Sequence, residues 1–364
     1  MYNLRPDAFL DSICIFIVIL VGIYNFYCIK KNKNGTGYFF FVILIFLFSL
    51  LYRPEDGDFW HYLDIYNLGV DYEYGHMEDF YYWLLALIPN NYLLWRVAIW
   101  LPAAVIIAFI FKSIKIPSNY ATLFFLMFAL TPSYYYTRNV LALAVMYLGI
   151  LYFCKQEKET NKSTNLLIFG GLIIASWFLH KSMPMYILFA LLSIILPLDK
   201  RTPIIALIIF PLMYGSIMIL SNTILSIDDL WGNKGNGSIY IEAIYTSFLN
   251  WKGFISLIIS YIPIFYFYIV AFRKPLSKNI PEFKYYKVFL LLAFITFYIS
   301  FLFFGQGSES LQPRIYKSSM IPFTFALCIY LKYNIQTKRG KTFLWLMGIC
   351  YLWDITIGFI TSVS

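Results

Sequence analysis

Long apolar segments recur along the whole chain, and mostly short polar loops separate them. Runs such as residues 39–51 and 204–220 show no regular alternation of polar and apolar positions, which favours helices over the strands of a β-barrel. We therefore predict an all-α polytopic membrane helical bundle, because about 20 apolar residues cross a bilayer as a helix. The expected spans, about twelve transmembrane helices, are residues 8–29, 37–52, 91–111, 119–136, 138–154, 164–180, 182–198, 203–222, 254–272, 286–304, 317–332 and 342–361.

Composition supports the same class. Of the 364 residues, 60% are hydrophobic and only 13% are charged, which excludes an ordinary soluble protein. Asp7 and Asp11 lie near the start of the first segment, basic residues follow it, and no small-residue cleavage site does, so we interpret it as a retained helix and not a signal peptide. Neither a repeat nor a linker is evident, and we expect one integral domain over residues 1–364.

Two segments on the predicted outer side exceed a simple turn. Residues 53–90 contain the apolar stretch 80–88, which is too short to cross a bilayer and should lie in the interface or re-enter. Residues 223–253 contain a run of Gly and Asn, which is typical of a mobile loop able to cover a groove.

Basic residues predict the orientation. Of the 28 Lys and Arg residues, 19 fall on one side of the predicted path, as expected for the cytoplasmic side, so both termini should lie outside. This sorting also accounts for the net charge of +9 without a nucleic-acid partner. The nine basic residues on the outer side are Arg5, Arg53, Arg96, Arg138, Lys181, Lys234, Lys252, Arg314 and Lys317.

The five cysteines lie within or at the ends of predicted helices and have no C-x-x-C spacing, so they indicate neither a disulfide framework nor a metal site. They are Cys14, Cys28, Cys154, Cys328 and Cys350.

Charged residues beside the outer helix ends are the functional candidates. A charge near hydrocarbon depth costs about 3 kcal/mol unless it meets a partner or a water-filled cavity. Separate arginines at one face suggest a polyanion such as a lipid-linked pyrophosphate, because guanidinium offers forked donors and keeps its charge. Arg96 is instead expected to be a snorkelling residue at the headgroup level. The candidates are Arg53 and Asp58 after the second helix, Arg138 opening the fifth, His180 and Lys181 in the turn between the sixth and seventh, and Arg314 before the eleventh.

Four short motifs together resemble the EpsG family of Wzy-like bacterial polysaccharide polymerases, in order and approximate spacing. Asn139 stands where the family often has Gln, and Phe59 where Tyr commonly follows the Asp, but neither change removes a charge. The motifs are Tyr52-Arg53 through Asp58 with Tyr62 and Tyr66, residues 138–144 (RNVLALA), residues 178–184 (FLHKSMP) and residues 314–316 (RIY).

The resemblance implies glycosyl transfer at the outer face of the bacterial plasma (inner) membrane, without metal, nucleotide sugar or other cofactor. A glycan on polyprenyl pyrophosphate would move onto a hydroxyl of an incoming lipid-linked unit. The implied partners are the polyprenyl-pyrophosphate-linked oligosaccharide, membrane lipid, a flippase and a chain-length regulator.

We assign the leaving pyrophosphate to Arg138 and Arg314, with Arg53 as a further contact. For the general base we choose His180 over Asp58, because histidine titrates near neutral pH; Asp58 could equally hold an arginine in place. Tyr62 and Tyr135 are expected to stack on sugars.

Two other readings stay open. Asp354, expected inside the last helix, would suit a proton-coupled flippase of lipid-linked oligosaccharide, although the polar cluster is one-sided. Asp56-Gly-Asp58 resembles the acidic motif of GT-C glycosyltransferases that use polyprenyl-monophosphate sugars, often with a divalent cation. A glycan ligase is a close chemical relative of the polymerase.

Overall fold

The computed structural model describes residues 8–51, 63, 66–67, 79–88, 91–130, 137–155, 162–199, 201–203, 251–302 and 311–349. Within these ranges the regular structure is helical and contains no strand, which confirms the all-α class. The chain divides into two compact units, Met1–Ile187 and Leu188–Ser364, which we describe one at a time.

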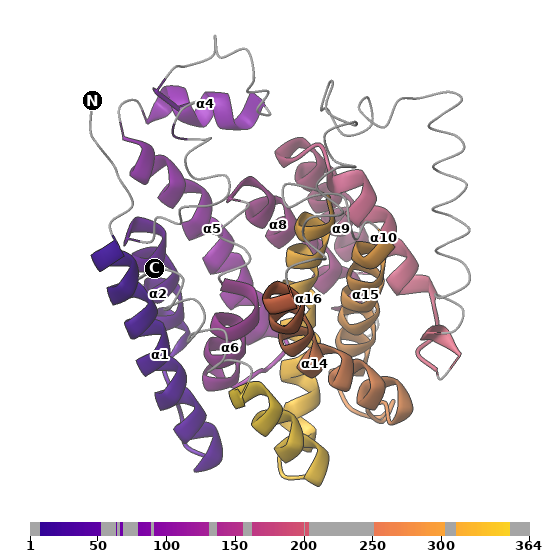
Figure 1. The fold of residues 1–364 in the computed structure, drawn as a ribbon. Helices are drawn as coiled ribbons and strands as arrows, with labels where there is room; N and C mark the ends of the chain where they lie inside the picture. The colour runs from indigo at the N-terminus through magenta and orange to yellow at the C-terminus, as the bar shows by residue number, and fades with distance from the viewer. Residues whose placement is uncertain are drawn as a thin grey trace. The chain divides into compact units, whose positions relative to one another are not determined.

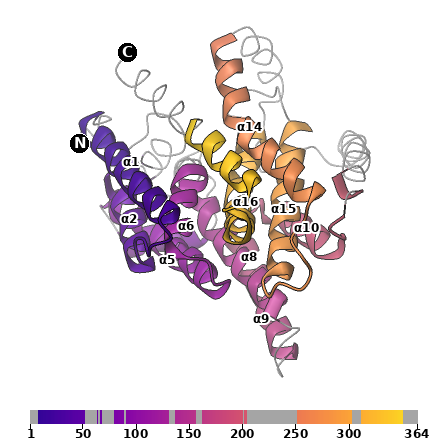
Figure 2. The same cartoon turned by 90° about the horizontal axis from the view of Figure 1, so that it is seen from below.

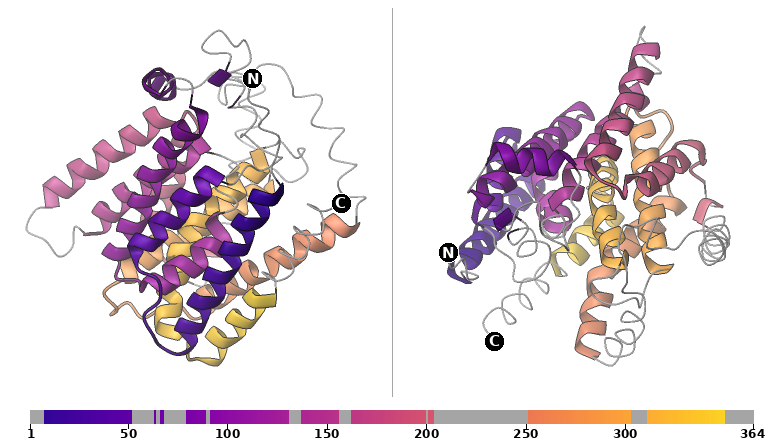
Figure 3. Two further views of the ribbon diagram at one scale, coloured as in Figure 1. Left: turned by 90° about the vertical axis from the view of Figure 1, so that its left-hand side faces the viewer. Right: turned by 90° about the horizontal axis from the view of Figure 1, so that it is seen from above.

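The N-terminal unit is a bundle of helices that pack along their lengths (Figure 1; Figure 3, left, indigo to magenta). Helix α2 packs on α5, α5 packs on α8, α8 on α9, and α1 on α6. Helix α6 continues directly into a π-helical turn, η2. The elements are α1 (Ala8–Lys30), α2 (Tyr38–Leu51), α4 (Asp79–Leu87), α5 (Tyr92–Ser113), α6 (Ser118–Phe124), η2 (Phe125–Leu130), α8 (Thr137–Lys155) and α9 (Lys162–Leu179).

Helix α10 (Met183–Ile195) carries the chain from the first unit into the second. The second unit also contains α14 (Trp251–Arg273), α15 (Phe283–Leu302) and α16 (Leu311–Asn334), followed by helical residues 338–349. Helices α15 and α16 form a closely packed pair (Figure 2). Their interface is aromatic, with the Phe289 and Phe325 rings 4.8 Å apart, centroid to centroid.

Most predicted helices are confirmed with small shifts at their ends. The span 317–332 was placed too late, because α16 already begins at Leu311. The prediction failed because Pro313, Arg314 and Lys317 interrupt the apolar pattern. The helix tolerates Pro313 because in the first turn a backbone N–H has no intrahelical partner to lose. The stretch 80–88 is the short helix α4. Nearly all of span 203–222, the loop 223–253 except its last residues, and Asp354 lie outside the described residues.

Among the described residues, three helices are long and apolar enough to cross a membrane by length and composition: Tyr92–Ser113, Lys162–Leu179 and Phe283–Ser300. Several shorter apolar helices accompany them. The chain thus has the helices of an integral membrane protein, while the count of about twelve spans stays a prediction.

A partly buried ion pair joins the start of α15 to the end of α16. Glu282 is 4% exposed, its carboxylate lies 2.9 Å from Lys332 Nζ, and it accepts a hydrogen bond from the Tyr333 hydroxyl. Burial alone would raise the pKa of Glu282, but the hydrogen bonds from Tyr333 and Lys332 and the Lys332 charge outweigh it, so the pKa lies below its usual value. Burial and the hydrogen bond and charge of Glu282 raise the pKa of Tyr333 to about 12.

We expect Glu282→Gln to lower the free energy of unfolding by about 2 kcal/mol at pH 7, because hydrogen bonds to a charged group are lost. The lowered pKa means that this stabilisation is present above pH 4.5, the ordinary value, and disappears as the pH falls through the folded-state pKa. Thermal melts of both proteins at several pH values test this. Lys338→Gln, an exposed charge change shortly after Lys332 in the sequence, is the control. A Glu282→Gln deficit that persists well below pH 4 would contradict the assignment.

Candidate functional site

The structure describes only part of the predicted site. Arg53, Asp58, Tyr62 and Tyr135 lie outside the described residues. The backbones of Arg138 and Arg314 are described, and His180 is described with its side chain. The site is therefore built from the helices that carry these three residues.

Helices α8 and α9 form a hairpin that brings Arg138 and His180 to the same end. Arg138 is the second residue of α8, and His180 directly follows α9. The two helices pack together (Figure 2), and they are joined at their other ends through residues 156–161. A chain that reverses between two packed helices places the start of one beside the end of the other.

Side-chain contacts confirm the antiparallel register. A Cβ on Gly149 would lie 3.3 Å from Leu172 Cβ and 3.5 Å from Phe169, and the Phe153 and Phe169 rings are 5.3 Å apart. Continued toward the open end, this register brings the first turn of α8 opposite the turn after α9. Arg138 and His180 therefore lie within about one helical turn of each other along the hairpin.

The first turn of a helix is an unusual place for an arginine. The helix dipole makes this end positive, so a cation there is disfavoured unless an anion accompanies it. Arg138 sits in that turn of α8. Its position thus favours the presence of an anionic ligand or side chain at this end.

We expect Gly149→Leu to separate α8 from α9 and to reduce both thermal stability and the activity proposed below. The added side chain has no room beside Leu172, and overpacking costs about 1–3 kcal/mol. Gly171→Leu on α9 is the matched control, because a Cβ there meets nothing within 4 Å. Melting curves and product yield are the measurements. Equal melting temperatures and yields for the two variants would contradict the close contact of α8 with α9 at Gly149.

His180 lies in a three-residue turn between α9 and α10, as predicted. Its N–H donates to the carbonyls of Ser176 and Trp177, and its carbonyl accepts from Met183 N–H at 3.0 Å. Its Nδ1 accepts from the backbone N–H of Ser182 at 3.1 Å and lies 2.8 Å from Ser182 Oγ. The half-buried ring is thus held in place by the turn itself.

Arg314 is the fourth residue of α16 and belongs to the second unit. The prediction that Arg314 precedes the helix was wrong, because Pro313 and the charged residues after it interrupt the apolar pattern inside the first turns of α16. Like Arg138, it occupies the first turn, where a cation opposes the helix dipole. Its convergence with Arg138 on one pyrophosphate stays a prediction.

Arg96 was missed as a candidate. The expected snorkelling residue is in fact 1% exposed and belongs, with Trp95 and Trp100, to the largest fully buried side chains. A snorkelling arginine needs access to the headgroups, which this burial denies. Helix α5 packs on α8, so Arg96 adds a buried cation to the unit that contains Arg138. The feature of the sequence that could have indicated a buried arginine is its position in the second turn of an apolar helix.

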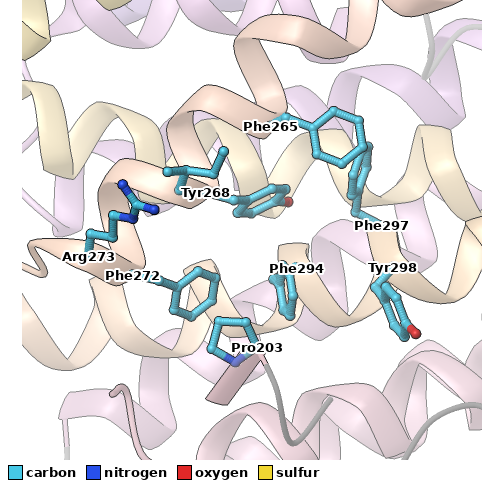
Figure 4. Close-up of a pocket in the computed structure, with 9 residues that line it drawn as sticks. Pro203, Phe265, Tyr268, Phe272, Arg273, Phe294, Phe297 and Tyr298 are labelled. Carbon is cyan, nitrogen blue, oxygen red and sulfur yellow. The ribbon is translucent and has the colours of Figure 1, made fainter. Parts of the chain in front are cut away.

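A cavity of about 450 Å³ in the second unit has a different chemistry (Figure 4). Helices α14 and α15 supply most of its lining, and Arg273 is its one charged residue among those described. It contains none of the predicted site residues and offers no carboxylate or imidazole for glycosyl transfer. The lining residues are Pro203, Phe265, Tyr268, Ile269, Phe272, Arg273, Phe294, Phe297 and Tyr298.

Metal-ligating side chains do not gather in the described part of the chain, where no group of three or more His, Cys, Asp or Glu could hold an ion. The pair Asp56 and Asp58 lies outside it. Among the described cysteines, Cys14, Cys28, Cys154 and Cys328 are free and buried, so those four form no disulfide framework.

The apolar helices are those of an integral membrane protein. A family model describes it further: the EpsG family matches residues 36–363, nearly the whole chain. The chain belongs to the EpsG family, a Wzy-like polysaccharide polymerase family. No curated protein and no solved structure matches it.

Proposed function

We propose that this protein polymerises lipid-linked oligosaccharide repeat units into a bacterial surface polysaccharide. The donor is a glycan on polyprenyl pyrophosphate, and the acceptor is a sugar hydroxyl of an incoming lipid-linked unit. The reaction takes place at the outer face of the plasma membrane and uses neither a metal nor a nucleotide sugar. A flippase that delivers the units and a chain-length regulator are the expected protein partners.

The observation that carries this proposal is that Arg138 and His180 lie at the same end of the α8–α9 hairpin, within about one helical turn of each other. A guanidinium and an imidazole carried at one end of a helical hairpin suit a reaction in which phosphate charge develops as a sugar oxygen attacks. Membership of the EpsG family supports a polysaccharide polymerase role.

The chemistry divides into two demands. The acceptor oxygen bonds to the anomeric carbon while the bond from that carbon to the pyrophosphate oxygen breaks, and its electron pair stays on the pyrophosphate. Arg138 and Arg314, with Arg53, offset the new charge, because forked donors match phosphate oxygens. The hydroxyl proton passes to a base, for which the sequence offers His180 and Asp58. Tyr62 and Tyr135 hold the sugars by stacking.

The test is elongation by the purified protein. Incubated in detergent with a lipid-linked repeat unit, it should produce a ladder of longer glycans, with and without EDTA. No ladder, together with transbilayer movement of the same lipid in liposomes, would reject the polymerase in favour of a flippase. Transfer only from a polyprenyl-monophosphate sugar, abolished by EDTA, would identify the metal-assisted glycosyltransferase, and a single transfer to a different lipid or protein acceptor would identify a ligase.

A further inference from the structure

The turn around His180 determines which ring nitrogen carries the proton. A backbone N–H is always a donor, so the nitrogen that faces it must accept. The N–H of Ser182 lies 3.1 Å from His180 Nδ1. In the neutral ring the proton is therefore on Nε2.

The Ser182 hydroxyl reinforces this tautomer. Its Oγ is 2.8 Å from the same Nδ1, and with Nδ1 accepting, the hydroxyl donates. If Nδ1 carried a proton, its hydrogen would face the hydrogen of the Ser182 N–H, and the Ser182 hydroxyl would have to accept a hydrogen bond instead of donating one. Two donors from one residue thus oppose a proton at this nitrogen.

A general base at this position would need an unprotonated nitrogen facing the acceptor hydroxyl. Nδ1 is engaged by the turn, and Nε2 already carries a hydrogen, so neither nitrogen is suited to take the proton. An Nε2–H is suited to donate to a phosphate or sugar oxygen. The end of the hairpin that also carries Arg138 is the place where such an oxygen would be bound.

We propose that Ser182 is a positioning residue that keeps the His180 proton on Nε2, so that His180 acts as a hydrogen-bond donor and not as the general base. This inference rests on the proposed polymerase function for its catalytic part. Nε2–H donates to the departing pyrophosphate oxygen without giving up its proton. The acceptor hydroxyl's proton goes to the carboxylate of Asp58, the other base that the sequence offers.

The tautomer can be observed directly in the full-length protein. The chain has three histidines, so His61→Gln and His76→Gln leave His180 as the single imidazole. With ¹⁵N-labelled histidine in lipid nanodiscs, the proton-bearing nitrogen should be Nε2. Ser182→Ala should raise the Nδ1–H population, and Ser182→Thr should restore the original spectrum. A spectrum dominated by Nδ1–H in the unchanged turn would overturn the inference.

Side-chain replacement tests the donor role in the elongation assay. Gln places an amide N–H near the Nε2 position and has no basic nitrogen, so His180→Gln should retain at least about a tenth of the rate, whereas His180→Ala should lose about 100-fold. Asn, whose amide reaches only the Nδ1 position, is the matched control and should resemble Ala. Ser182→Ala should slow elongation about threefold to tenfold. Equal losses for Gln and Ala would overturn the donor role.

The two proposals fail separately. Absence of a glycan ladder from the unmutated protein would reject the polymerase, while the spectrum would still report the tautomer. A normal ladder combined with an Nδ1–H ring would reject only the role proposed for Ser182 and His180.

Discussion

Arg138→Ala abolishes glycan elongation, with an expected loss of about 10³-fold or more. In the proposed reaction the side chain supplies a positive charge to a pyrophosphate that becomes more negative as the glycan leaves, so the interaction should strengthen in the transition state. Arg138→Lys should recover only part of the rate, because an ammonium lacks the forked donors that match phosphate oxygens. The rate of ladder formation by purified variants is the measurement.

The control for this prediction comes from the same helix. Lys155 lies in the last turn of α8, where its Nζ is 5.1 Å from the centre of the Tyr152 ring. Lys155→Ala removes the same charge at the opposite end and should elongate at nearly the normal rate. Both variants should remain folded and inserted, as judged by gel filtration and melting. Near-normal ladders from Arg138→Ala would show that Arg138 does not bind the leaving group.

Arg314→Ala reduces elongation by about 100-fold or more, since a second fixed cation is removed from the same developing charge. The sharper test is a double-mutant cycle with the lysine variants, whose residual rates remain measurable. If Arg138 and Arg314 hold one pyrophosphate, Arg138→Lys and Arg314→Lys should not combine multiplicatively. This cycle tests the convergence of residues from the two units.

Arg339→Ala is the control for the second unit, because Arg339 is exposed and lies after α16. It should change elongation little. Multiplicative losses in the lysine cycle would mean that the two arginines act at independent places, and Arg314 would then have to be assigned to the acceptor or to another part of the chain.

The helices that could be predicted are those with long apolar runs. The turn at His180 was located to within a residue, because a histidine and a lysine interrupt the apolar sequence between α9 and α10. The start of α16 was not, because Pro313, Arg314 and Lys317 interrupt the hydrophobic pattern within the first turns of a real helix. Hydropathy detects what lipid or protein can bury, and it does not detect the polar first turn of a helix.

Arg96 shows a second limit. Its position near the start of an apolar helix suits equally a snorkelling side chain and a buried one, and the two differ only in what packs around it. Burial at 1% exposure distinguishes them. The proton position on His180 is similar, since it depends on hydrogen bonds of 3.1 Å and 2.8 Å to Ser182 that only the folded turn defines.

By itself the sequence determined the helical membrane class and predicted an orientation and a short set of outer charged residues, because hydropathy and loop charge are local properties that a bilayer sorts directly. Only the tertiary structure decided that α8 and α9 form an antiparallel pair with Arg138 and His180 at the same end, that Arg96 is buried, and that Ser182 faces His180 Nδ1. These depend on packing and directed hydrogen bonds between specific atoms, which spacing along the chain does not encode.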